Sequence, residues 1–216
     1  MIWLFYWYIG NFLLSYSIII ILLPYSYLNQ QKRETGRSFM CKILLLGIGN
    51  EILGDDGVGI HVARYFEKLD LQLFDVKYAG IGGFNLLDYI EGYEKVIIVD
   101  AYEKHYDCTE DYKIAVYDKN EIIDKSLIYS SHETSLGMGL QLAKETVPDI
   151  VPDDIKFVAI EIPIQTNYSN RLTKHTKKLA LQAILQIYCI LDSFHIKIYC
   201  KDINVDMLDN EINFFN

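Results

Sequence analysis

Residues 42–60 read KILLLGIGNEILGDDGVGI, and this stretch decides the fold. Its apolar start, bounded by Gly47 and Gly49, is typical of a strand that is covered on both faces, as in a parallel sheet. The glycines allow a sharp turn after the strand. Two adjacent carboxylates, Asp55 and Asp56, then stand at the mouth of the next predicted helix. Because buried carboxylates are costly unless a positive or hydrogen-bonding group meets them, the stretch also indicates a functional site.

The composition is that of a folded, acidic protein. Of the 216 residues, 51% are hydrophobic, which excludes a disordered or solvating chain. The formal net charge is −9; residues 1–39 hold three bases and one acid, +2 in sum, so the remainder carries −11. An acidic domain of this kind is not expected to bind nucleic acid. The four bases within residues 171–178 have the spacing of a solvated helix face.

The first 39 residues form a separate apolar extension. No charged residue occurs within residues 1–31, so this segment has the hydropathy and length of a membrane anchor. The alternative is a leader translated from an early start codon, because Met40 stands just before the first predicted strand. Under either interpretation the domain is expected in the cytoplasm, and only the anchor would bring it to a membrane. Four cysteines without a close pair agree with that reducing compartment.

From Met40 onward, predicted strands and helices alternate with short connections. This pattern indicates βαβ units and a mostly parallel sheet in one α/β domain over residues 40–195. Strands are predicted over residues 42–46, 74–79, 95–99, 155–162 and, at an edge, 112–117. Helices are predicted over residues 58–69, 84–90, 134–145 and 173–191, and residues 196–216 are expected to form a polar tail.

Polar residues stand at equivalent places in this layout. Asp55 and Asp56 follow the first strand, Asp100 ends the third, and His132 precedes a helix. In open α/β sheets, ligands bind beyond the carboxyl ends of the strands, where the strand order reverses. Two carboxylates and an imidazole there would form a divalent-metal site. Taken singly, each residue has a simpler interpretation, since Asp55 can cap the next helix and His132 can be a capping or surface histidine.

Sites based on glycine or serine motifs fit this sequence less well. A dinucleotide fingerprint needs a third glycine where Ile52 stands, and a phosphate near Gly54 would meet two carboxylates. The Gly-Lys-Ser/Thr of a P-loop is missing, and the serines near His132 lack the Gly-x-Ser-x-Gly elbow of a hydrolase. The sequence therefore predicts no organic cofactor.

Taken together, these motifs resemble those of the hydrogenase maturation proteases, over residues 41–191. The resemblance rests on Gly-Ile-Gly-Asn at residues 47–50, Asp-Asp-Gly-x-Gly at residues 55–59, the strand ending in Asp100-Ala101, Ser-His at residues 131–132, and Ile-Glu-Ile-Pro at residues 160–163. It implies a three-layer αβα fold. It also implies an endopeptidase that removes the C-terminal extension of a nickel-iron hydrogenase large-subunit precursor after nickel insertion.

The resemblance further implies roles for individual residues. The three ligands that engage the nickel of the precursor correspond to Asp56, Asp100 and His132, which are therefore the expected catalytic and metal-binding residues. Asp55 would be a capping or orienting neighbour of Asp56. Hydrolysis could proceed by polarising a carbonyl or by activating water, because no serine or cysteine nucleophile matches.

The sequence departs from the family pattern after the second strand. Many members carry an acidic residue followed by Gly-Gly-Thr, whereas residues 78–83 read YAGIGG. The missing acid argues against a catalytic role for this loop, although its glycines could shape substrate docking. Two alternative functions stay open, namely a peptidase of the same fold acting on another substrate and a non-enzymatic protein that binds nickel or a hydrogenase subunit.

Overall fold

The computed structural model describes residues 42–80, 86–104, 112–124, 136–165 and 168–198. The chain divides into two compact units, residues 1–40 and 41–216, and all described residues belong to the second. The predicted extension over residues 1–39 lies outside the described residues, as do His132 and most of the tail over residues 196–216. Within the described ranges, no helix is both long and apolar enough to cross a membrane.

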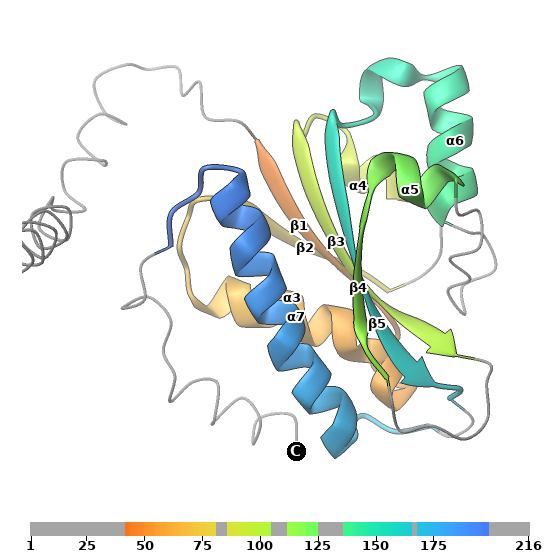
Figure 1. The fold of residues 1–216 in the computed structure, drawn as a ribbon, viewed down its shortest axis with the longest axis vertical. Helices are drawn as coiled ribbons and strands as arrows, with labels where there is room; N and C mark the ends of the chain where they lie inside the picture. The colour runs from red at the N-terminus through yellow and green to blue at the C-terminus, as the bar shows by residue number, and fades with distance from the viewer. Residues whose placement is uncertain (1–41, 81–85, 105–111, 125–135, 166–167, 199–216) are drawn as a thin grey trace, which may run out of the picture. The chain divides into compact units, whose positions relative to one another are not determined.

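The described residues form an α/β fold around a five-stranded sheet with the order β2-β1-β3-β5-β4 (Figure 1). The strands are β1 (Ile43–Ile48), β2 (Asp75–Ala79), β3 (Lys95–Lys104), β4 (Ile114–Asp118) and β5 (Asp154–Pro163). All pairs are parallel except that of β4 with β5, which confirms the predicted mostly parallel sheet and its edge strand. The chain passes from β1 to β2 on one side and then to β3 on the other, so the strand order reverses between β1 and β3.

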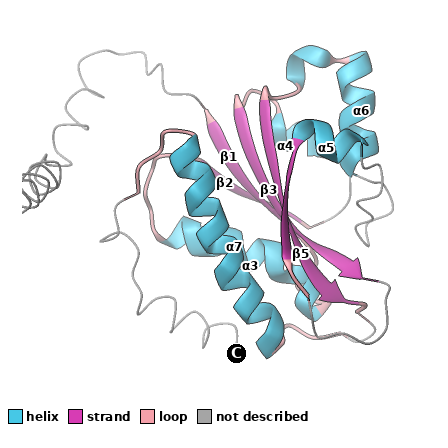
Figure 2. Ribbon diagram, viewed as in Figure 1, coloured by secondary structure: helices cyan, strands magenta, loops and turns pink. Residues whose placement is uncertain are grey.

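Helices cover both faces of the sheet, which appears in magenta between two groups of cyan helices in Figure 2. One layer consists of α3 (Val58–Lys68) and α7 (Lys174–Ser193). The other consists of α4 (Leu86–Ile90), α5 (Lys119–Asp124) and α6 (Leu136–Thr146). Short 3-10 helices are η1 (Gly54–Gly57) and η3 (Pro148–Ile150). The predicted three-layer fold is confirmed, although α5 was not predicted because six residues are too few for a periodic apolar stripe.

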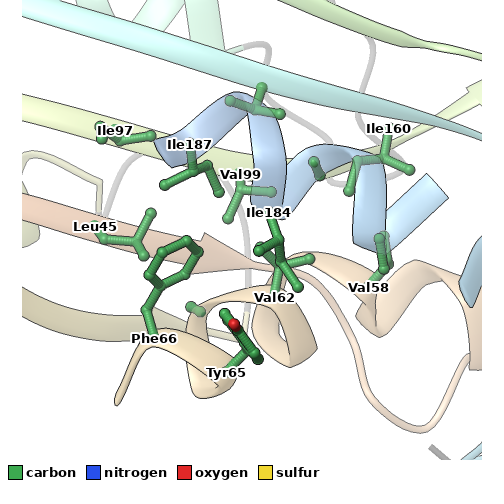
Figure 3. Close-up of a cluster of buried hydrophobic side chains, with 14 of the residues drawn as sticks. Leu45, Val58, Val62, Tyr65, Phe66, Ile97, Val99, Ile160, Ile184 and Ile187 are labelled. Atoms are coloured by element: carbon green, nitrogen blue, oxygen red, sulfur yellow. The ribbon is translucent and has the colours of Figure 1, made fainter. Parts of the chain in front are cut away.

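Alternate residues of the strands build two apolar clusters. Leu45 and Val99 pack against α3 and α7, together with Phe66 and Ile184 of those helices (Figure 3). Leu44 and Leu46 of β1 pack against α4, α5 and α6, together with alternate residues of β3 and β5. Because successive side chains of a strand point to opposite faces, a fully apolar strand such as β1 requires helices on both sides.

The strand β3 is longer than predicted. The apolar pattern predicted a strand over residues 95–99 that Asp100 would end, whereas β3 runs to Lys104 and pairs with β5 over that whole length. Its pairing with β1, however, stops at the Gly47–Val99 pair. Asp100 therefore lies inside β3, at the level where the neighbouring strand β1 ends. The prediction that Asp100 ends the third strand was wrong.

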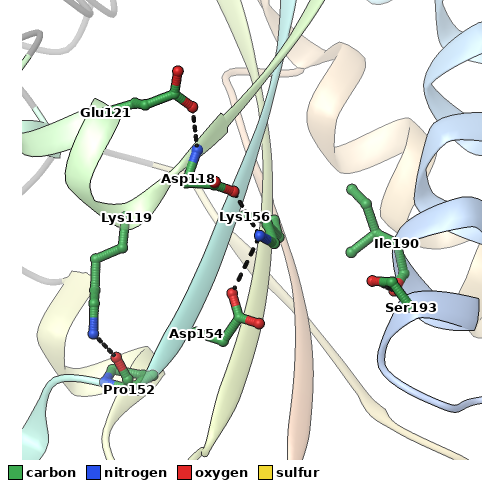
Figure 4. A network of polar contacts seen from close by, with 8 residues as sticks. All are labelled: Asp118, Lys119, Glu121, Pro152, Asp154, Lys156, Ile190 and Ser193. Atoms are coloured by element: carbon green, nitrogen blue, oxygen red, sulfur yellow. Dashed lines mark hydrogen bonds and ion pairs between the residues drawn. The ribbon is translucent and has the colours of Figure 1, made fainter.

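Polar contacts join the edge strand β4 to β5 (Figure 4). Lys156 donates a hydrogen bond to Asp118 at 2.5 Å and lies 3.6 Å from an oxygen of Asp154. The hydrogen bond to Asp118 raises the pKa of Lys156. Lys119 donates to the carbonyl of Pro152 at 2.8 Å and so connects the start of α5 to the chain before β5. Exposed pairs of this kind each contribute at most about 1 kcal/mol.

The start of α3 lies unusually close to the sheet because two positions are glycine. A Cβ atom at Gly59 would lie 2.2 Å from the carbonyl oxygen of Ile48 and 2.3 Å from that of Val99. A Cβ atom at Gly47 would lie 2.5 Å from the carbonyl oxygen of Gly59. The helix therefore begins in the gap where β1 ends beside β3, and this approach brings η1 into contact with β3.

We expect Gly59→Ala to lower the free energy of unfolding by about 2–3 kcal/mol, because the added methyl group would overlap two backbone oxygens. The matched control is Gly80→Ala, where a Cβ atom would meet no described atom within 4 Å. This control should change the free energy of unfolding by less than about 0.5 kcal/mol. Chemical denaturation measures both, and equal effects would contradict the close approach.

Candidate functional site

Three buried carboxylates occur where the strand order reverses. Asp55 and Asp56 lie in η1, directly beyond the carboxyl end of β1, with 1% and 2% of their surface exposed. Asp100 is 4% exposed and lies in β3 at the level where β1 ends. Since η1 contacts both β3 and β5, these acids gather at one edge of the sheet, where α/β proteins bind ligands.

The backbone folds tightly around Asp56. Asn50 N donates to the carbonyl oxygen of Asp56 at 3.3 Å, and Leu53 N donates to the carbonyl oxygen of Asn50 at 3.0 Å. Gly49 has a φ of 151°, and a Cβ atom there would lie 2.2 Å from the carbonyl oxygen of Asp56. The glycine turn thus brings the segment of Asp56 to the sheet edge, as the sequence predicts.

Asp55 binds the N-terminus of α7. Its carboxylate accepts hydrogen bonds from Thr173 N at 2.6 Å and from Thr173 Oγ1 at 2.9 Å. Thr173 is itself the N-cap residue of α7, and its Oγ1 accepts from Thr176 N at 3.3 Å. A carboxylate at this position also interacts favourably with the helix dipole. Asp55 therefore connects the loop after β1 to the beginning of α7.

The structure contradicts the simpler interpretation of Asp55, that of a cap for the next helix. Neither η1 nor α3 has a side-chain cap among the described residues. The carboxylate instead caps a helix whose N-cap residue follows 118 positions later in the sequence. No local pattern around Asp55 could indicate this partner, because only the fold brings the two segments together.

The chain that enters α7 also pairs with the loop after β1. Leu53 and Ser169 form a parallel bridge. On either side of it, Gly54 N donates to the carbonyl oxygen of Ser169 at 2.6 Å, and Ser169 N donates to that of Ile52 at 3.0 Å. Together with the Asp55–Thr173 contact, these hydrogen bonds hold the segment that carries Asp56.

An ion pair fixes the same loop to α3. The guanidinium of Arg64 donates two hydrogen bonds to the carboxylate of Glu51, the longer of them 2.8 Å. It also lies 5.6 Å from the centre of the Tyr78 ring. Burial raises the pKa of Tyr78, and the carboxylate of Glu67 adds to this effect. The bidentate geometry orients the loop, although both partners of the pair are more than one-third exposed.

The predicted basic helix face is confirmed for Lys174 and Lys178, whereas Arg171 precedes the first residue of α7. Arg171, Lys174 and Lys178 are exposed, whereas Lys177 is only 8% exposed. Lys177 stands seven residues before the buried Ile184, a spacing that places both on the core-facing side of α7. A lysine can occupy such a position because its long apolar stem packs like a hydrophobic side chain.

His132, the third predicted ligand, lies outside the described residues, as does most of the loop after β2. Among the described residues alone, no group of three His, Cys, Asp or Glu side chains could hold a metal ion. The structure thus brings Asp56 and Asp100 to one edge, and the role of the set of three stays a prediction.

Comparisons with known proteins identify the family. The model of the hydrogenase maturation proteases, HycI, matches residues 60–189. This chain belongs to the hydrogenase maturation protease family. Protein FrxA of Pyrococcus furiosus is 33% identical over 141 residues, which cover 62% of this chain and 96% of FrxA. The predicted resemblance and the predicted protease activity are therefore confirmed.

Solved structures support the same fold. The hydrogenase maturating endopeptidase HybD from E. coli matches with a TM-score of 0.57 and 22% identity, covering 70% of this chain and 93% of HybD. The [NiFe] hydrogenase maturation protease HybD from Thermococcus kodakarensis also has a TM-score of 0.57 and 22% identity, covering 69% of this chain and 98% of that one. At this level of identity the likeness concerns the arrangement of the strands and helices.

The Asp55–Thr173 contact can be tested by a double-mutant cycle. We expect Asp55→Ala to lower the free energy of unfolding by about 2–3 kcal/mol, because it removes two hydrogen bonds to a charged carboxylate that is 1% exposed. Thr173→Val should be destabilising too, and the two effects should be coupled by about 1 kcal/mol or more. Additive effects would show that the two side chains do not interact.

Proposed function

We propose that this protease removes the C-terminal extension of a nickel-iron hydrogenase large-subunit precursor once nickel is inserted, and that Asp56, Asp100 and His132 recognise that nickel. One observation carries the proposal. Two carboxylates, each at most 4% exposed, lie at the carboxyl edge between β1 and β3 in a hydrogenase maturation protease. The nickel is part of the substrate, and no organic cofactor is needed.

The chemistry of these residues suits nickel. Carboxylate oxygens and imidazole nitrogens are ligands of divalent first-row metals, and imidazole suits nickel in particular. Burial makes a carboxylate charge costly, so a cation that approaches Asp56 and Asp100 adds a favourable interaction with both. A precursor that carries nickel would therefore bind more tightly than an empty one.

The proposal of His132 as the third ligand rests on the order of the elements along the chain. Ile98 of β3 packs against the layer of α4, α5 and α6. Asp100 stands two residues later in the same strand, so it belongs to the same face of the sheet. The C-terminal end of α6 leads through η3 to the start of β5, at the amino edge of the parallel strands. The N-terminal end of α6 therefore points toward the carboxyl edge. His132 precedes Leu136, the first residue of α6, by four residues, which limits their separation to about 14 Å.

The residues around Asp56 would act by holding the loop that carries it in a fixed position. The Asp55–Thr173 contact and the Arg64–Glu51 ion pair keep the loop in place, so Asp56 meets the substrate without a large rearrangement. A metal ion in the substrate polarises a carbonyl or activates water for hydrolysis. The carboxylates would orient that water and accept its proton. The reaction is expected in the cytoplasm, where a cysteine pattern without close pairs is usual.

Substitution of the proposed ligands tests the assignment. We expect Asp56→Asn and His132→Ala each to lower the rate of peptide release from a nickel-loaded precursor by at least about 100-fold, since each removes one ligand of the nickel. Mass spectrometry of the released C-terminal peptide measures the rate. The matched controls are Asp149→Ala and His195→Asn, which alter exposed residues away from this edge. If both ligand variants still release the peptide at the normal rate, the site is wrongly assigned.

Nickel loading tests the recognition step. We expect the nickel-loaded precursor to be cut and the nickel-free precursor to remain intact, because only the loaded form presents a cation to the carboxylates. Measuring the affinity for both forms, with Asp56→Asn alongside the natural enzyme, should show a preference that the variant loses. Cleavage of unrelated peptides without nickel would instead indicate another substrate, and tight binding without any cleavage would indicate an accessory protein.

A further inference from the structure

We propose that the exposed side chains of Ile52 and Tyr168 form a docking surface for an apolar segment of the precursor, close to its cleavage site. We call these two side chains the apolar rim. They are 61% and 83% exposed, high values for residues of this size. The proposal rests on the proposed function, since it concerns how the same substrate reaches the same edge of the sheet.

The backbone brings the two residues of the rim close together. Leu53 and Ser169 are paired in a parallel bridge, and Ile52 and Tyr168 are the residues directly before them. The residues directly before a parallel bridge lie close to each other along the two backbones. The hydrogen bond from Ser169 N to the Ile52 carbonyl oxygen, 3.0 Å long, keeps the two segments together.

The rim lies on the loop that carries the site. Ile52 precedes Asp56 by four residues, and Asp55 between them is bound to Thr173. Asp56 is only 2% exposed, so a protein that brings a metal ion to it must press against the surface around it. Protein interfaces of standard size bury about 800 Å² per partner, an area that extends well beyond a single carboxylate. A precursor engaged at Asp56 would therefore cover the rim.

The rim has the properties of an interface anchor. Scattered exposed apolar residues need no explanation, but adjoining ones on a restrained backbone favour binding because little freedom is lost. Tyrosine is also enriched among the residues that dominate binding energy. Their backbone hydrogen bond and their position near the site distinguish this pair from Met138 and Leu142, which are exposed on α6 in the other helix layer.

Charges around the rim indicate what flanks the apolar segment of the partner. Arg171 and Lys174 are exposed just after Ser169, at the entrance to α7. The nearby acids are already engaged, since Glu51 pairs with Arg64 and Asp55 binds Thr173. The exposed Arg171 and Lys174 can pair with acidic groups of a partner, in a chain of net charge −9. The precursor segment that fits the rim is therefore apolar and flanked by acidic groups.

Steady-state kinetics with the nickel-loaded precursor tests the rim. We expect Ile52→Ser and Tyr168→Ser each to raise KM about tenfold, because each removes an apolar contact with the substrate, and to leave kcat within about twofold. Leu185→Ser is the matched control, since Leu185 is 56% exposed in the middle of α7, and its KM should not change. Ile52→Leu should retain the normal KM, which separates an apolar contact from a defect of the loop.

The outcomes distinguish this proposal from the function on which it rests. If the natural enzyme cleaves the precursor and both serine variants keep its KM, the rim is not a docking surface and the proposed function stands. If the natural enzyme does not cleave the precursor at all, the proposed function itself fails.

We also expect the double variant R171Q/K174Q to raise KM several-fold at low salt, an effect that should vanish at about 0.5 M salt. An unchanged KM of this double variant at low salt would contradict the proposal that acidic groups flank the apolar segment of the precursor.

Discussion

The close approach of α3 to the sheet is the constraint on which the rest of this structure depends. Gly59 lies so near the carbonyl groups of Ile48 and Val99 that any side chain would overlap them. The helix can therefore begin between β1 and β3, and η1 must lie directly above the end of β1. Because of this geometry, a pair of carboxylates is held in a buried position that a looser turn would expose to water.

Two adjacent residues in that turn have different surroundings. Asp55 faces the N-terminus of α7 and accepts two hydrogen bonds from Thr173, so its charge is compensated within the protein. Asp56 lies in the same turn, enclosed by the backbone of Gly49 and Asn50, at the edge where Asp100 is also buried. The first acid thus stabilises the position of the second, which is the one we propose to meet the substrate.

The held loop also connects the site to its surroundings. Its backbone bridges the chain before α7, and its outer surface carries Ile52 beside Tyr168. A loop that is fastened on several sides can present both a buried carboxylate and an exposed apolar contact with little loss of conformational freedom on binding. Under the proposed function, such an arrangement would join recognition and chemistry of a protein substrate in one segment.

Much of this protein could be predicted from its sequence. The apolar runs over residues 42–46 and 95–99 indicate buried strands of a parallel sheet, and the glycine turn with Asp55 and Asp56 indicates the candidate site. These features are local, since they depend on the alternation of side chains and on the conformations open to glycine. The extent of β3, the burial of Lys177 and the binding of Asp55 to Thr173 were decided only by the tertiary structure. Each depends on a neighbour that is distant in sequence, and short-range patterns carry no information about such neighbours.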